Sequence, residues 1–200
     1  MKMAVQDDAP TKTRLLDSAQ RLMLAQGYAA TTVDEICDAA KLTKGSFFHY
    51  FESKEALGKA VLERFCASAQ ERHQTCCGRQ ADPLKRVYSY VDGMIQLSQE
   101  GATQGCLLGT FAQELSDTNP QIRSLCAQAF GQWAKALQRD LSEAKAAHAP
   151  KAAFEPKSLA EYIIAVVEGA LILAKAKQDP RVVKESLSHV RRYLEQLFRT

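Results

Sequence analysis

The sequence lacks long hydrophobic runs. The nearest candidate for a membrane segment, residues 162–174, spans only 13 residues and contains Glu168, whereas a helix needs about 20 apolar residues to cross a bilayer. The N-terminal stretch is polar and has no apolar core of the kind that marks a secretion signal. We therefore expect a protein without membrane segments that is located in the cytoplasm.

Glycine and proline are also scarce, with ten and six residues among 200. Such a composition excludes collagen-like, proline-rich and disordered chains. No long stretch alternates between apolar and polar residues in the way that a half-buried strand would. The sequence therefore predicts an all-α fold.

Neither sign of charge dominates, because 26 lysines and arginines stand against 23 aspartates and glutamates, for a net charge of +3. Composition alone therefore does not indicate a nucleic-acid partner. The six cysteines show no CxxC spacing, and without an export signal we expect them to remain thiols. His73, Cys76 and Cys77 form a short cluster. Adjacent cysteines on a helix do not readily face one ion, so we expect a structural role there, and no metal or other cofactor.

The sequence does contain a repeated pattern of helix starts. Three pairs of Asp or Asn with a following proline, at residues 82–83, 119–120 and 179–180, place a capping side chain before proline at the first helical position. Thr32 and Glu35 have the spacing of a capping box. These ends and the apolar periodicity predict helices at residues 11–26, 33–40, 44–50, 54–79, 83–100, 105–116, 120–148, 157–178 and 180–198.

Two of the short helices are predicted to form a helix-turn-helix. Residues 33–40 carry apolar side chains on one face, a three-residue turn follows, and residues 44–50 form a second helix that can enter a major groove. Lys44 can donate to guanine acceptors, Gly45 permits close approach of the backbone, and His49 can donate to a phosphate. The candidate DNA contacts are Thr32, Thr43, Lys44, Gly45, Ser46, His49, Tyr50 and Lys54.

Residues 27–36 and 39–57 resemble the signature of the TetR family of transcriptional regulators in their glycines, turn, aromatic residues and Ser-Lys-Glu run. The resemblance implies an all-α homodimer that binds double-stranded palindromic operator DNA and usually represses transcription. It also implies a DNA-binding domain at residues 11–71, with the helix-turn-helix at about 32–51, and a ligand-binding and dimerisation domain at residues 72–200. The family often has tyrosine where this chain has Phe48, so a hydroxyl that could contact phosphate is missing there.

The segment 105–109, Gly-Cys-Leu-Leu-Gly, with Gln-Glu-Leu at 113–115, looks like a TetR subgroup that controls reductases for reactive electrophiles such as aldehydes, maleimides, acrylate or hypochlorite. In part of that subgroup, a cysteine at the position of Cys106 is the sensor. The start of a helix lowers the pKa of a thiol. A buried ammonium at Lys175, seven residues after Glu168, would stabilise the thiolate. The alternatives are that Cys106 is a small core residue and that Glu168 and Lys175 form a surface ion pair.

The helices after residue 54 carry apolar residues at inward spacing, which form either plain core or a ligand pocket. The candidates for a pocket that takes a small-molecule or electrophilic inducer, besides Cys106 and Lys175, are Phe65, Tyr88, Met94, Phe111, Phe130 and Trp133. The last two helices carry a large apolar surface, which predicts a dimer interface. Its candidate residues are Ile163, Val167, Leu171, Leu187, Val190 and Leu194.

These features predict a DNA-binding repressor of a small operon that a small ligand, or an electrophile or oxidant at Cys106, releases from its operator. The alternative is an all-α ligand-binding or redox-sensing module that acts through protein contacts without operator binding, since any short helical hairpin has polar residues on its open face. No Ser-His-Asp order, glycine-rich phosphate loop, HExxH motif or acid–base carboxylate pair is present. We therefore expect that the protein is not an enzyme.

Overall fold

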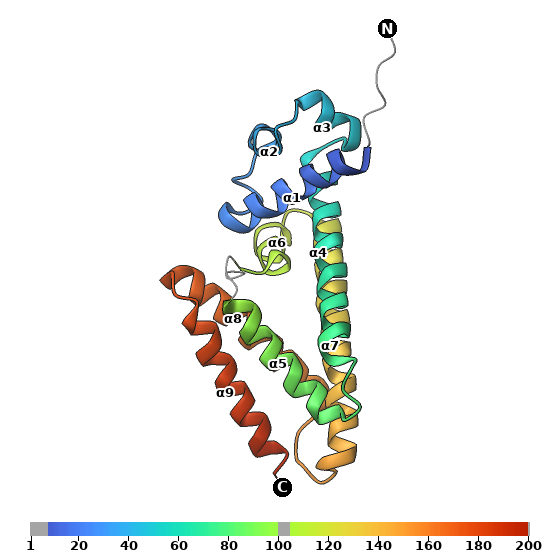
Figure 1. Cartoon of the computed structure of the whole chain (residues 1–200), viewed down its shortest axis with the longest axis vertical. Coiled ribbons are helices and arrows are strands. Elements are labelled where there is room, and N and C mark those ends of the chain that lie inside the picture. Colours follow the sequence, from blue (N-terminus) through green and yellow to red (C-terminus); the bar gives the residue numbers. More distant parts are fainter. Residues whose placement is uncertain (1–7, 100–104, 200) are drawn as a thin grey trace. The chain divides into compact units, whose positions relative to one another are not determined.

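The structure of the protein is a computed structural model that describes residues 8–99 and 105–199 (Figure 1). These residues form α-helices and no strand, which confirms the expected all-α fold for the described part of the chain. The helices are α1 (Asp8–Gln26), α2 (Val33–Ala40), α3 (Lys44–Tyr50), α4 (Lys54–Cys77), α5 (Pro83–Gln99), α6 (Leu107–Leu115), α7 (Pro120–His148), α8 (Pro156–Lys177) and α9 (Arg181–Leu197). Among the described residues, no helix is both long and apolar enough to cross a membrane.

Two of the three predicted Asp–Pro or Asn–Pro helix starts follow the predicted capping chemistry. In the third, α9 begins at Arg181, after Pro180, and Pro180 has no side-chain cap bond. Before α5, Asp82 accepts the N–H two residues later at 2.8 Å, and before α7, Asn119 accepts the N–H groups two and three residues later at 3.1 and 3.0 Å. One boundary differs in a way that matters for function. Helix α6 begins at Leu107, later than predicted, so Cys106 directly precedes the helix.

The contacts between residues divide the chain into two compact units. The first contains the chain up to Cys66 together with Leu107–Arg123, and the second contains Ala67–Cys106 and the chain from Ser124 onward. The predicted domains are two continuous segments, 11–71 and 72–200. In the structure, residues 107–123 belong instead to the first unit. Helix α6 returns because it packs against α1, far away in the sequence (Figure 1).

In the first unit, α2 packs against both α1 and α3. The Phe111 ring of α6 is fully buried in this unit and lies against the ring of Tyr28, with 5.2 Å between the two centroids. Other fully buried apolar side chains of the unit are Leu15, Met23, Ile36, Phe47, Leu57 and Ile122. This core sets the orientation of α3.

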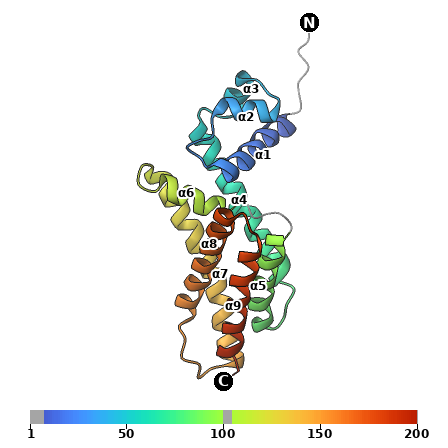
Figure 2. The same cartoon turned by 90° about the vertical axis from the view of Figure 1, so that its left-hand side faces the viewer.

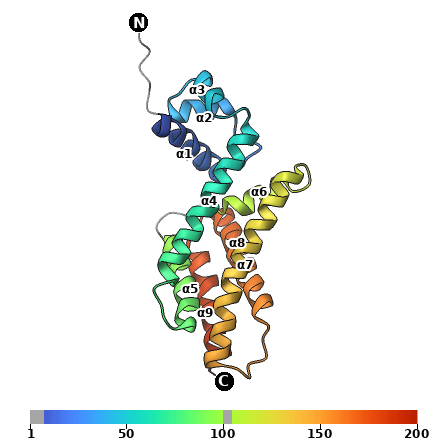
Figure 3. The same cartoon turned by 90° about the vertical axis from the view of Figure 1, so that its right-hand side faces the viewer.

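In the second unit, α9 packs against both α5 and α8. Figures 2 and 3 show these helices running alongside the later part of α7. The core between them includes Val87, Tyr90, Leu137, Leu141, Ile163, Val167, Leu187 and Leu194. The burial of apolar surface among these four helices stabilises the unit.

Five of the six residues predicted for the dimer interface are buried within the single chain. These are Ile163, Val167, Leu187, Val190 and Leu194, and Leu171 packs against the same core. The apolar stripe of α9 is covered by α5 and α8 of its own chain, so it is not available to a partner. The large apolar side chains that remain exposed in this unit are Tyr162, Ile172, Leu173 and Tyr193. We now expect the dimer contact on this surface, where the rings of Tyr162 and Tyr193 lie 6.0 Å apart.

Two leucines distinguish the core from the expected dimer surface. Leu194→Asp should unfold the second unit, because the loss of a buried leucine side chain alone costs about 2–5 kcal/mol. Leu173→Asp, at a side chain that is 48% exposed, should keep the helical content and thermal unfolding of the wild type but weaken self-association. Circular dichroism and sedimentation velocity measure both effects. A Leu173→Asp protein that self-associates as tightly as wild type would place the dimer contact elsewhere.

Candidate functional site

Helix α3 presents a row of side chains outward because Phe47 fixes it from inside. The Phe47 side chain is fully buried, and Thr43 caps the helix by accepting the N–H of Ser46 at 3.1 Å. The residues on the open side are therefore determined by helical geometry. Of the predicted DNA contacts, Thr32, Thr43, Lys44, Gly45 and His49 are exposed, and Ser46, Tyr50 and Lys54 are half-buried.

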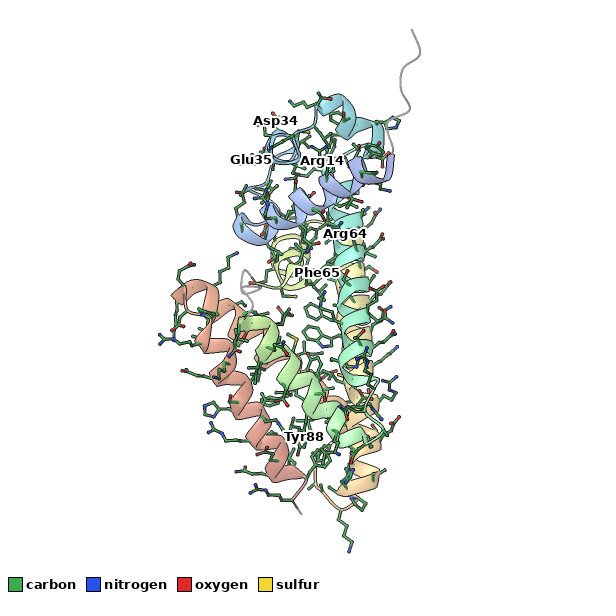
Figure 4. All side chains as sticks on the ribbon, in the orientation of Figure 1. Arg14, Asp34, Glu35, Arg64, Phe65 and Tyr88 are labelled. Carbon is green, nitrogen blue, oxygen red and sulfur yellow. The ribbon has the colours of Figure 1, made fainter. Side chains whose placement is uncertain are left out.

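The turn between α2 and α3 is held by backbone and side-chain bonds. Lys41 adopts the left-handed conformation with φ of 53°, and its N–H donates to Asp38 at 3.0 Å. The guanidinium of Arg14 on α1 donates to the carbonyl of Ala40, at the C-terminal end of α2 (Figure 4). A cation at this end also interacts favourably with the helix dipole. Helix α1 thereby fixes the angle at which the turn leads into α3.

Two of the predicted DNA contacts already have partners on α2. The ammonium of Lys44 lies 2.8 Å from the carboxylate of Asp34, and this hydrogen bond raises the pKa of Lys44. Both side chains are largely exposed, so the pair is weak and Lys44 can exchange Asp34 for a phosphate or a base. The hydroxyl and N–H of Thr32 bind Glu35, which completes the predicted capping box and lowers the pKa of Glu35.

Phe48 is a candidate contact that the sequence reasoning missed. Its side chain is 57% exposed, one helical turn after Lys44 on the open face of α3. An exposed aromatic ring on a helix that enters a major groove can contact the methyl group of thymine. The signal in the sequence is the helical spacing of four residues between Lys44 and Phe48.

Lys54 has an internal role that its position in the sequence did not reveal. Its ammonium donates to the carbonyl groups of Tyr28, Ala29 and Thr31 at 3.0, 3.4 and 2.9 Å and lies over the Tyr28 ring. A lysine has three donors, and all three are directed at this loop. The phosphate contact that we expected at Lys54 would require it to release these carbonyls.

The same loop is bound from α6 by Glu114. The carboxylate of Glu114 accepts the N–H groups of Tyr28 and Ala29 at 3.2 and 2.7 Å. It approaches Gly27 so closely that a Cβ atom on Gly27 would lie 2.4 Å from its Oε1 atom, and Gly27 has a φ of +94°. Only glycine satisfies both constraints. We call residues 27–31 the α1–α2 loop, which is held by Lys54 through its carbonyls and by Glu114 through its N–H groups.

In the second unit, Cys106 pairs with an acid. The half-buried thiol hydrogen-bonds with the carboxyl group of Glu168 on α8, whose Oε1 atom is buried without a hydrogen-bond partner among the described residues. Burial raises the pKa of Glu168, and the bond with Cys106 opposes this shift. Lys175 is exposed, so the prediction of a buried ammonium beside the thiol is wrong. The group that faces Cys106 is a carboxyl.

The side chain of Tyr90 lies within electrostatic reach of several of these groups. Tyr90 accepts the indole N–H of Trp133 at 2.9 Å. Burial strongly raises the pKa of Tyr90, and the nearby Cys77, Cys106 and Glu168 raise it further. We refer to Tyr90, Trp133, Cys77, Cys106 and Glu168 as the Tyr90 cluster. The second unit has a further buried polar residue in Asp140, which is paired with Arg86.

The six apolar pocket candidates do not come together in one unit. Phe65 and Phe111 belong to the first unit, while Tyr88, Met94, Phe130 and Trp133 pack against the core of the second. In the second unit, a surface cavity of about 420 Å³ includes Tyr88 (Figure 4), whose ring lies 3.5 Å from the guanidinium carbon of Arg191. The cavity is lined by Gln80, Asp82, Leu84, Lys85, Tyr88, Ser89 and Arg191. None of the other candidates lines it.

A helix-turn-helix unit joined to a second all-helical unit defines a class of DNA-binding transcriptional regulators. Residues 15–61 match the family described as "Bacterial regulatory proteins, tetR family", and residues 83–190 match "Tetracyclin repressor-like, C-terminal domain". The protein belongs to the TetR family of bacterial transcriptional regulators.

Similar proteins support this assignment over nearly the whole chain. The chain is 31% identical to the HTH-type transcriptional repressor DhaR of Mycobacterium sp. (strain GP1), with 90% of each chain covered. It is 28% identical to the HTH-type transcriptional repressor NemR of Escherichia coli (strain K12), with 90% of this chain and 92% of NemR covered. The crystal structure of reduced E. coli NemR has a TM-score of 0.78 at 29% identity and covers 91% of this chain and 95% of its own. The regulatory protein TetR from Rhodobacter sphaeroides has a TM-score of 0.82 at 25% identity, covering 93% and 97%.

Lys44→Ala tests the DNA-binding face. The variant should lose about 1–3 kcal/mol of binding free energy on operator DNA, because it removes a donor to bases or phosphate. Fluorescence anisotropy with the DNA upstream of the gene, at fixed salt, measures the loss. Lys184→Ala, which removes an exposed lysine of α9, is the matched control and should bind like wild type. Equal affinity of Lys44→Ala and wild type would exclude α3 docking through its N-terminal end.

Lys54→Ala separates the two roles of that residue. The loss of the bonds to the α1–α2 loop should lower the free energy of unfolding by about 1–3 kcal/mol, because the loop carbonyls lose their partner. The slope of operator affinity against salt concentration should stay that of wild type. Denaturant unfolding and a salt titration of binding measure the two quantities. A slope reduced by about one charge would instead support the phosphate contact.

Proposed function

We propose that the protein is an operator-binding repressor that an electrophile releases from DNA by reacting with Cys106. Two chains would bind one palindromic operator, each placing α3 in a major groove, with half-sites about 34–36 Å apart. The repressors DhaR and NemR, which are similar over nearly the full chain, support the repressing role. The observation that carries the sensor is the bond between the Cys106 thiol and the buried Glu168 carboxyl.

Glu168 suits the role of proton acceptor for the thiol. Burial raises its pKa toward that of a thiol, which makes proton transfer from Cys106 to the carboxylate less unfavourable. The resulting thiolate attacks the activated carbon of an electrophile such as a maleimide, and a carbon–sulfur bond forms. The proton held by Glu168 returns to the adjacent carbon of the adduct. No oxidant is needed, and every atom of the thiol and of the electrophile is retained.

The position of Cys106 in the chain suits a signal to the DNA-binding surface. Cys106 directly precedes α6, and α6 carries Glu114, which holds the α1–α2 loop next to the helix-turn-helix. An adduct that changes where α6 begins would change how this loop is held. To convert 99% bound to 99% released protein, the adduct must favour the released state by about 5.5 kcal/mol, a free energy that a covalent bond can supply.

Cys106→Ser tests the sensor directly. The variant should fold and bind operator like wild type, but N-ethylmaleimide should no longer release it from DNA. Cys66→Ser removes a thiol that is half-buried like Cys106 and is the matched control; it should respond like wild type. Anisotropy of labelled operator DNA during titration with the reagent gives both results.

Three outcomes would contradict the proposal at different points. If the reagent released Cys106→Ser as readily as wild type, Cys106 would be a core residue and the inducer would act elsewhere. If neither protein bound the upstream DNA, the operator would lie elsewhere or the chain would act through protein contacts. Binding without any response to the reagent in wild type would leave repression in place and point to a reversible ligand.

A further inference from the structure

Two neighbouring cysteines at the end of α4 form a pair of thiols that no part of the proposed function uses. Cys76 and Cys77 are the last residues of α4, and their sulfur atoms lie 2.9 Å apart. Cys76 is exposed to solvent, while the Cys77 side chain is buried at 1% exposure. One thiol is therefore accessible from outside, and its partner lies directly beneath it.

A disulfide between the two residues is disfavoured by the backbone. Cα atoms of adjacent residues are about 3.8 Å apart across a trans peptide, whereas disulfide-bonded residues usually have Cα atoms about 4.4–6.8 Å apart. The described residues contain no cis peptide bond. A single larger atom placed between the two sulfur atoms avoids this constraint, because each sulfur then bonds to the added atom and not to the other sulfur.

A metal ion such as zinc lacks the remaining ligands. Structural zinc sites use four ligands, and among the described residues no group of three or more His, Cys, Asp and Glu side chains is placed to hold a metal. The nearby His73 ring faces Asp140 at 3.6 Å. The pair therefore suits a soft atom that takes two sulfur ligands from the protein and already has its third bond to an organic substituent.

We propose that Cys76 and Cys77 bind a monosubstituted trivalent arsenical as a two-sulfur chelate. The arsenical carries two hydroxyl groups on arsenic, and each thiol replaces one of them. Two arsenic–sulfur bonds form, two arsenic–oxygen bonds break, and each thiol proton leaves with a hydroxyl as water. Arsenic keeps its oxidation state, so the reaction needs no oxidant or reductant. Soft sulfur ligands match this soft centre.

The surroundings give such a ligand access and space. The exposed Cys76 thiol reacts first, and Cys77 then closes the chelate from below. Across from Cys76, Gly93 of α5 has no side chain, and a Cβ atom there would lie 3.8 Å from the Cys76 sulfur. Because Cys76 is exposed, the substituent on arsenic can point into solvent.

The Tyr90 cluster provides a built-in reporter of binding. Cys77 belongs to this cluster, in which Tyr90 accepts the indole N–H of Trp133. Trp133 is the single tryptophan of the chain. A change at the Cys77 sulfur should alter the environment of Tyr90 and with it the fluorescence of Trp133.

Phenylarsine oxide is the probe for the test, used on the full-length reduced protein. One equivalent should remove two free thiols, give a single arsenical adduct in the intact mass, and change Trp133 fluorescence. The adduct should persist in excess glutathione and be reversed by 2,3-dimercaptopropanol, because only a dithiol competes with a chelate. Cys76→Ser should bind about 10²–10⁴-fold more weakly, since it loses the intramolecular second bond.

Matched variants identify the residues. Cys106→Ser and Cys66→Ser should bind the probe like wild type, which separates this site from the proposed sensor. Cys77→Ser should lose the chelate as Cys76→Ser does, but because Cys77 is buried, the exposed Cys76 variant is the deciding one. Glutathione-resistant binding that survives in Cys76→Ser would overturn the proposal. So would a stoichiometry of one thiol per arsenical in wild type.

Discussion

The bonds between the Glu114 carboxylate and the N–H groups of the α1–α2 loop are the interaction on which the first unit depends. A loop between two helices contains backbone groups that need partners, and each of these exposed hydrogen bonds contributes about 0.5–1.5 kcal/mol net. Glu114 supplies acceptors, and Lys54 supplies donors to the carbonyls of the same loop. Because α2 starts where this loop ends, the two side chains also position the helix-turn-helix. A carboxylate on α6 thereby holds the loop that leads into the helix-turn-helix.

Local rules were sufficient to predict the helices and the helix-turn-helix. The capping box of Thr32 and the buried Phe47 involve residues close in sequence, so spacing alone identifies them. The errors concern distant partners. Glu114 lies 86 residues from Tyr28, and no periodicity reveals such a contact. Likewise, the apolar stripe of α9 indicates that something covers it but not whether the cover is another chain. The sequence also does not show whether a cation at a helix start, such as Lys54, binds backbone carbonyls or a phosphate.

The second unit combines an apolar core with two sulfur sites of different chemistry. Cys106 interacts with a carboxyl that can accept its proton, which suits reaction with one carbon electrophile. In the Cys76–Cys77 pair, the two sulfurs lie side by side, which suits a centre that takes two ligands. The hydroxyl of Tyr90 lies near both Cys77 and Cys106, although they are far apart in sequence. The two proposals thus assign different classes of thiol reagent to separate residues of one unit.

The return of α6 to the first unit has a consequence for hybrid regulators made by exchanging DNA-binding segments between relatives. A fusion joined at Cys66 would keep α1, α2 and α3 but would pair their loop with a foreign α6. If the foreign helix lacked a carboxylate at the position of Glu114, the N–H groups of Tyr28 and Ala29 would lose their acceptor. In the reverse hybrid, which keeps this chain's α6, a foreign loop with a side chain at the position of Gly27 would collide with Glu114. A working hybrid must therefore transplant residues 107–123 together with the N-terminal segment, as a discontinuous exchange.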